Sequence, residues 1–170
     1  ITSLGYSKKI IYRNKALIND DIYVTGVLGD SFMGLQILKN KIKLSKQLKN
    51  YFTRKYYLPD IRIKLTKKLL NFANSSIDLS DGLIDDLSKM INNQNLSFSL
   101  NENKIPISKN LLKIIKMKNM KKIKLVSNGD DYQILFTASK DKSRIIAQTS
   151  KNLGIKISKI GKICSNKKRS

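Results

Sequence analysis

Hydrophobic and polar residues repeat along this chain with two periods, one typical of strands and one typical of helices. Segments with the two periods alternate along the sequence. Alternating or short unbroken apolar runs predict strands over 22–26, 75–79, 96–100, 132–137 and 155–163. Apolar residues three and four apart predict helices over 32–38, 42–52, 61–70, 83–91, 108–117 and 140–153. Because strands and helices interleave, the predicted fold class is α/β (α+β), with a mixed β-sheet flanked by helices.

The domain organisation follows from length and composition. The chain has 170 residues, of which 41% are hydrophobic, enough for one domain with a core. We expect residues 21–164 to form a C-terminal α/β domain, residues 1–20 to be the end of an N-terminal domain and its linker, and residues 165–170 to be a disordered tail. The first residue is Ile1 rather than methionine, so the chain is expected to be a piece of a longer protein.

Two residue types restrict the chemistry. A single cysteine, Cys164, excludes an internal disulfide and a cysteine-based zinc site, in agreement with a reducing compartment. Histidine is absent from the sequence, which excludes serine–histidine and cysteine–histidine catalysis within this chain. Neither a membrane-spanning apolar stretch nor a signal-peptide pattern is present, so we expect a cytoplasmic protein without membrane association.

The charge of the chain is strongly positive, with a formal net charge of +22. Clustered basic residues would favour nucleic-acid binding, but these are mostly lysines and are scattered over the whole length. Abundant lysine, isoleucine and asparagine together are expected of a genome rich in A and T. We therefore expect no specific nucleic-acid partner, and we keep a lysine-rich nucleic-acid-binding module as the less favoured alternative.

The most informative segment is the turn that follows the predicted strand 75–79. It places two carboxylates, Asp78 and Asp81, and the hydroxyl of Ser80 at the start of a predicted helix, with Gly82 leaving room for an anion. Carboxylate oxygens suit Mg²⁺, and helix N-termini attract phosphate. The alternative is structural, because Ser80 or Asp81 could simply cap the helix.

Two further polar turns could contribute. The turn over 26–34 is rich in glycine but lacks the spacing of known nucleotide-binding loops, so Asp30 or Ser31 is more simply interpreted as a helix cap. The turn at Gly129 places Asp130 and Asp131 side by side, where the two carboxylates repel each other unless cations or hydrogen bonds offset the repulsion. That repulsion favours a functional role for this turn.

Taken in order, the blocks over 21–31, 77–83 and 129–137 resemble thiamine-monophosphate kinase. The resemblance runs over residues 1–162 and looks like the C-terminal part of that enzyme, which belongs to the superfamily of aminoimidazole ribonucleotide synthetase. It implies that ATP phosphorylates thiamine monophosphate, with Mg²⁺ as cofactor, in a homodimer when the protein is full length. Because the other half of the site would lie in the missing domain, we expect the chain alone to be nearly inactive.

The resemblance also implies roles for individual residues. Asp78 and Asp81 match magnesium ligands, and Ser80 matches a contact to the ATP phosphates. Lys9 is the nearest counterpart of an ATP-binding arginine, and Asp130 stands where the family has a substrate-contacting acidic residue, usually Glu. The supporting positions are Gly82, Asp30, Gly129 and Asp131.

Sister enzymes of the same superfamily are the main alternative function. Selenophosphate synthetase, the ribonucleotide synthetase and the hydrogenase maturation factor share the architecture and the ATP chemistry. The amino-acid sequence of the blocks around Asp78 and Asp130 favours the thiamine enzyme. Phosphoryl transfer depends on positioning and on cations rather than on a strong base, so the absence of histidine is compatible with each of these enzymes.

Overall fold

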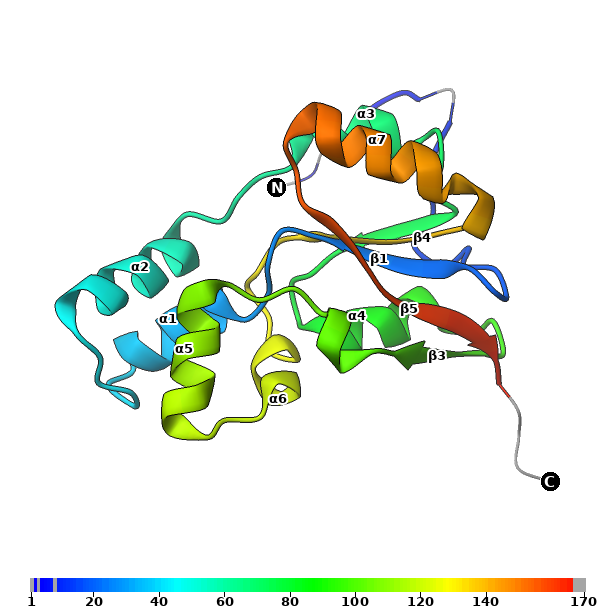
Figure 1. The fold of residues 1–170 in the computed structure, drawn as a ribbon. Coiled ribbons are helices and arrows are strands. Elements are labelled where there is room, and N and C mark those ends of the chain that lie inside the picture. The colour runs from blue at the N-terminus through cyan, green and yellow to red at the C-terminus, as the bar shows by residue number, and fades with distance from the viewer. Residues whose placement is uncertain (1, 3, 8, 167–170) are drawn as a thin grey trace.

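The computed structural model describes residues 2, 4–7 and 9–166, and its centre is a five-stranded sheet (Figure 1). The strands lie in the order β2-β4-β1-β5-β3, and each neighbouring pair is antiparallel. Their bounds are β1 Asp21–Thr25, β2 Ser75–Asp78, β3 Leu96–Leu100, β4 Ile134–Ala138 and β5 Ile157–Ser165. The α/β (α+β) class is confirmed. The expected mixture of parallel and antiparallel pairs is not found, because the period of two is the same in both kinds of sheet and does not report strand direction.

The described residues form seven α-helices and two short 3₁₀ turns, η1 Glu102–Lys104 and η2 Lys140–Lys142. The helices are α1 Asp30–Leu38, α2 Lys46–Tyr57, α3 Ile63–Leu69, α4 Leu83–Met90, α5 Lys109–Lys118, α6 Lys122–Val126 and α7 Ser143–Leu153. Six of them lie where the apolar period predicts a helix. Helix α6 was not predicted, since its five residues are too short to display a period.

The alternation along the central strand divides the core into two layers. Ile22 and Val24 face the cluster that α4 contributes to, while Tyr23 faces the cluster built with α3 and α7. Phe136 of β4 stacks on Tyr23 with ring centroids 5.2 Å apart. Helices α3 and α7 therefore cover one face of the sheet and α4 covers the other (Figure 1).

A third cluster lies beyond the end of the sheet, where α1, α2, α5 and α6 pack together (Figure 1). Its buried members are Met33, Ile37, Phe52, Leu111, Ile114 and Leu125. A Cβ atom at Gly34 would lie 2.3 Å from the carbonyl oxygen of Phe52, so only glycine allows α1 and α2 to approach this closely. Helix α1, which begins within the turn over 26–34, thus ties that turn to the helical cluster.

Described segments near both ends of the sequence contact or join the sheet. The N–H of Ser76 donates to the carbonyl of Tyr12, with 3.4 Å between nitrogen and oxygen, and Ser165 is the last residue of β5. Of the expected tail, residues 167–170 lie outside the described residues. The division into a linker and a C-terminal domain stays a prediction. Among the helices that the structure describes, none has the length and apolar character needed to cross a membrane.

Candidate functional site

The three polar turns, far apart in sequence, meet at one end of the sheet. Strands β1 and β2 end there and β4 begins there, because β4 is antiparallel to both. The N–H of Asp130 donates to the carbonyl of Ser80 over 3.0 Å. The hydroxyl of Thr25 donates to the side-chain oxygen of Gln133 over 2.8 Å and so connects the end of β1 to the same region.

Two glycines permit the contact between the second and third turns. A Cβ atom at Gly129 would lie 1.8 Å from the carbonyl oxygen of Ser80. At Gly82, where φ is 120°, a Cβ atom would lie 2.3 Å from the carbonyl oxygen of Ser127. The space beside Gly82, expected to admit an anion, is thus bordered by protein backbone, and both glycines serve close packing of the turns.

The turn over 78–82 is organised by Asp86, a residue that the sequence analysis did not single out. Its side chain is fully buried, and one carboxylate oxygen accepts the backbone N–H groups of Ser80, Asp81 and Gly82 at 3.0, 3.0 and 3.2 Å. The other oxygen accepts from the ammonium of Lys89 at 2.8 Å. A buried carboxylate needs such partners, because burial otherwise penalises its charge.

The alternative that Ser80 or Asp81 caps the helix after this turn is not observed. The residue at the start of α4 is Gly82, and no side chain caps the helix there. Instead Asp86 binds the turn from inside the first turn of α4. One signal in the sequence could have found it, because Asp86 falls on the same helical face as the buried Leu83, Leu87 and Met90. A carboxylate at an apolar position of a helix requires a specific partner.

The two proposed magnesium ligands have different surroundings. Asp78 ends β2, is exposed and lines a groove. Asp81 is also exposed, but its carboxylate forms an ion pair with Lys89. Contact with Asp81, and then with Asp86, raises the pKa of the Lys89 ammonium. The structure therefore leaves Asp78 open to the groove and occupies Asp81 with a lysine.

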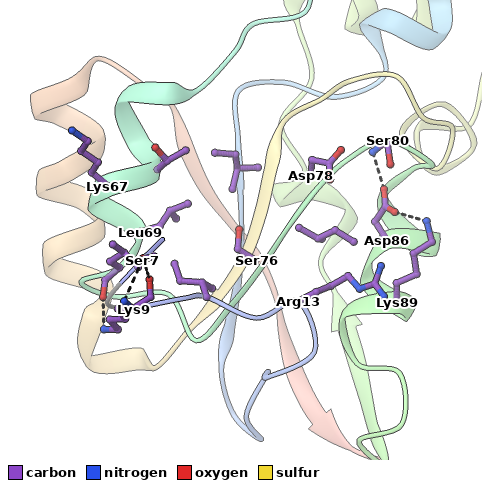
Figure 2. Close-up of a pocket in the computed structure, with 15 residues that line it drawn as sticks. Ser7, Lys9, Arg13, Lys67, Leu69, Ser76, Asp78, Ser80, Asp86 and Lys89 are labelled. Atoms are coloured by element: carbon purple, nitrogen blue, oxygen red, sulfur yellow. Dashed lines mark hydrogen bonds and ion pairs between the residues drawn. The ribbon is translucent and has the colours of Figure 1, made fainter. Parts of the chain in front are cut away.

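The groove has a volume of about 780 Å³ and brings three of the expected site residues together: Lys9, Asp78 and Ser80 (Figure 2). Its walls come from the N-terminal segment, α3, β2, α4 and the start of β4. Lys9 Nζ donates to the carbonyl of Leu70 at 2.6 Å. The remaining lining residues are Ser7, Ile11, Arg13, Thr66, Lys67, Leu69, Leu70, Ser76, Ile77, Asp86, Lys89 and Ile134.

Arg13 is a groove residue that the sequence analysis passed over. It lies near Lys89, at the end of the groove formed by the turn over 78–82 (Figure 2). Lys9 and Lys67 lie at the other end, near Ser7 and Leu69. The groove thus has basic side chains at both ends, and its lining also includes apolar side chains such as Ile11 and Ile77, a composition that suits an anionic ligand with a flat apolar part.

Asp30, in the first polar turn, is buried away from this groove. Its carboxylate accepts from the hydroxyls of Tyr51 and Ser108, both at 2.7 Å. Burial raises the pKa of Asp30, and these two hydrogen bonds oppose the effect. Neither Asp30 nor Ser31 caps α1, because the residue at its start is Gly29 and no side chain of its own turn caps the helix. Asp30 connects α1 to α2 and α5.

Asp131 connects the first and third turns. One of its carboxylate oxygens accepts the N–H of Gly29 at 2.7 Å and the other accepts that of Ser31 at 3.4 Å. Burial, opposed by these two hydrogen bonds, raises the pKa of Asp131 to about 7. Its neighbour Asp130 is only half-buried and adopts a left-handed backbone, with φ 69°. Asp131 thus joins two turns, and Asp130 is the more accessible of the two carboxylates.

The donor set limits how a metal could bind. Among the described residues (2, 4–7 and 9–166), no group of three or more histidine, cysteine, aspartate or glutamate side chains could hold a metal ion. Magnesium is commonly held by one or two carboxylates together with substrate phosphates and water. Of the two expected ligands, Asp78 lines the groove and could serve in such an arrangement, whereas Asp81 is not among the described residues that line it and is paired with Lys89.

The fold defines a class of protein. A solved thiamine-monophosphate kinase from Stenotrophomonas maltophilia K279a matches with a TM-score of 0.81 at 26% identity, over 91% of this chain and 50% of that chain. A complex of AaThiL with AMPPCP and TMP matches with a TM-score of 0.78 at 26% identity, over 91% of this chain and 48% of that chain. Escherichia coli HypE shares the fold alone, with a TM-score of 0.69 at 13% identity over 91% of this chain and 47% of that chain. The chain has the aminoimidazole ribonucleotide synthetase-like fold.

The curated relatives narrow this class. Thiamine-monophosphate kinase of Buchnera aphidicola subsp. Acyrthosiphon pisum (strain APS) is 41% identical over 152 residues, which are 86% of this chain and 47% of that enzyme. The kinase of Buchnera aphidicola subsp. Schizaphis graminum (strain Sg) is 38% identical over 169 residues, 99% of this chain and 52% of that enzyme. No family model matches the chain. The predicted resemblance is confirmed: the chain is related to thiamine-monophosphate kinases and spans about half the length of these relatives.

The role of Asp86 can be tested through stability. Asp86→Ala removes the acceptor of three backbone N–H groups, so we expect the free energy of unfolding to fall by about 1–3 kcal/mol. Asp85→Ala is the matched control, because Asp85 is exposed in the same helical turn and its loss should cost less than about 0.5 kcal/mol. Urea unfolding of both variants measures the difference, and equal losses would show that Asp86 does not organise the turn.

Asp131 should make stability depend on pH. Its pKa is about 7 in the folded chain and about 4 in an unfolded one, so between these values the folded state binds more protons. The contribution of Asp131 to stability is therefore greatest below pH 4 and declines as the pH rises toward 7. Asp131→Asn cannot titrate. In urea unfolding at several pH values, the stability of the wild type relative to this variant should decline over that range, and parallel curves would contradict the assignment.

Proposed function

We propose that this chain is the C-terminal domain of a thiamine-monophosphate kinase, which transfers the γ-phosphate of ATP to thiamine monophosphate and yields thiamine diphosphate and ADP. The observation that supports it most is that Asp78, Ser80 and Lys9 line one groove in a chain 41% identical to such a kinase. Both substrates are further supported by the AMPPCP and TMP in the related AaThiL complex.

The groove suits a nucleotide. Its volume of about 780 Å³ lies within the range of small-molecule sites. The hydroxyl of Ser80 can donate to a phosphate oxygen at one end. At the other end, Lys9 can do the same by exchanging the carbonyl of Leu70 for phosphate. Apolar side chains of the groove lining, such as Ile77, can pack against the base or sugar.

Asp78 and Asp81 are proposed to hold magnesium together with the phosphates. Magnesium, when bound, would neutralise the charge on the transferred phosphoryl group. The acceptor is a phosphate with a second pKa of about 6, already largely ionised at neutral pH, so no strong general base is needed. The side chains of this chain therefore orient the phosphates and bind the cation, which requires no histidine.

The proposed substrate contact rests on the third polar turn. The proposed assembly rests on the length of the relatives. Asp130 follows directly on the contact between Gly129 and Ser80, so a group bound at Asp130 would lie beside the phosphate end of the groove. Asp130 is proposed to contact thiamine monophosphate. The half of the relatives that this chain does not span would complete the site and form a cytoplasmic homodimer.

The alternatives receive less support. The hydrogenase maturation protein HypE matches at 13% identity, against 26% for the thiamine-monophosphate kinase of Stenotrophomonas maltophilia. A nucleic-acid-binding module remains the less favoured alternative. Of the 34 basic residues in this chain, five are arginines and 29 are lysines, and lysine is poorly suited to reading bases. We therefore propose small-molecule substrates and no specific nucleic acid.

A chimera tests the proposed reaction. The matched half of the Buchnera aphidicola (strain APS) enzyme is replaced by this chain, and thiamine diphosphate formed from thiamine monophosphate and ATP is measured. We expect turnover, and we expect Asp78→Ala or Asp81→Ala to lower it at least about 100-fold with the fold retained. Asp85→Ala is the matched control and should keep full turnover. A folded chimera without thiamine diphosphate, or an active Asp78→Ala variant, would reject the proposal.

The chain by itself should behave differently from the chimera. Because the relatives are about twice as long, we expect the purified 170-residue chain to fold and to form little or no thiamine diphosphate. The same assay, run beside the chimera at equal protein concentration, measures this. Turnover by the chain alone would show that the site is complete within it.

A further inference from the structure

Lys89 stands between a buried carboxylate and an exposed one. Its ammonium lies 2.8 Å from Asp86, whose side chain is fully buried, and it also pairs with Asp81, whose side chain is 59% exposed. The two contacts differ in strength for this reason. An exposed ion pair is weak and exchangeable, whereas a buried carboxylate keeps its counter-charge firmly.

The position of Lys89 is fixed from the Asp86 side. The N–H groups of Ser80, Asp81 and Gly82 bind one oxygen of Asp86 to the backbone of the turn. The position of its second carboxylate oxygen is therefore fixed relative to α4. Lys89, one helical turn further along α4, reaches that oxygen and the wall of the groove (Figure 2). A positive charge is therefore present beside Asp81 before any metal arrives.

We propose that Lys89 is an internal cation that occupies the Asp81 carboxylate until a divalent metal displaces it. The inference rests on the proposed function, since it takes Asp81 as a metal ligand. Lys89 keeps its contact to Asp86 throughout and releases only Asp81. The consequence is that this chain binds a divalent ion more weakly than its carboxylates alone would.

Metal affinity without any enzymatic reaction tests the inference. Mn²⁺ binding to the chain is followed by the electron paramagnetic resonance signal of the free ion. We expect Lys89→Gln to bind Mn²⁺ about two- to fivefold more tightly, the factor that corresponds to an exposed ion pair. The gain should vanish when Asp81→Asn is combined with Lys89→Gln.

Lys67→Gln is the matched control, because it removes the same charge from the same groove away from the turn. An equal gain in Lys67→Gln, or none in Lys89→Gln, would overturn the competition and leave the proposed kinase function standing. Absence of Mn²⁺ binding in every variant would overturn the inference for this chain, whereas failure of the kinase proposal, and with it of the metal role of Asp81 beside bound phosphates, is seen only in the chimera assay.

A second measurement uses the wild type and does not depend on the folding of a variant. Lysines are acetylated with acetic anhydride, with and without Mg²⁺, and the products are quantified by mass spectrometry. Release from Asp81 should make Lys89 more reactive when Mg²⁺ is present, while Lys67 stays unchanged. Equal reactivity of Lys89 in both samples would overturn the inference.

Discussion

The carboxylate of Asp86 determines the shape of the turn on which the candidate site depends. It is fully buried, and it is stable there because three backbone N–H groups and the Lys89 ammonium share its charge. The same contacts fix the backbone of Ser80 and Asp81, so their side chains start from a defined position. A turn formed before its ligand arrives loses less entropy on binding, which favours precise positioning of the bound group.

A second buried carboxylate has a comparable role on the other side of the site. Asp131 accepts the N–H groups of Gly29 and Ser31 and so connects the start of α1 to the turn that precedes β4. Antiparallel pairing of β4 with both β1 and β2 places all three turns at one end of the sheet. Buried acidic residues therefore build the frame of the candidate site, while Asp78 and Asp81 stay exposed at its surface, Asp81 in an ion pair with Lys89.

Much of this arrangement could be predicted from the sequence. The periods located the five described strands and six of the seven described helices, and the three polar turns that the sequence singles out meet at one end of the sheet. Strand direction could not be predicted, because alternation is the same in both kinds of sheet, and α6 was too short to show a period. The role of Asp131 and the place of Arg13 in the groove depend on contacts between segments distant in sequence, whereas Asp86 makes local contacts and could have been found from its position on the apolar face of α4. The Asp81–Lys89 ion pair depends on how the turn folds back on α4.

Hydrogen exchange at the turn tests the central claim most directly, namely that Asp86 forms the turn without any ligand. The amides of Ser80, Asp81 and Gly82 are followed by NMR in the ligand-free chain and in Asp86→Ala. We expect slow exchange in the wild type and fast exchange in the variant, with the strand amides of β1 protected in both. Exchange of these three amides in the wild type at the rate of an unstructured chain would contradict the account.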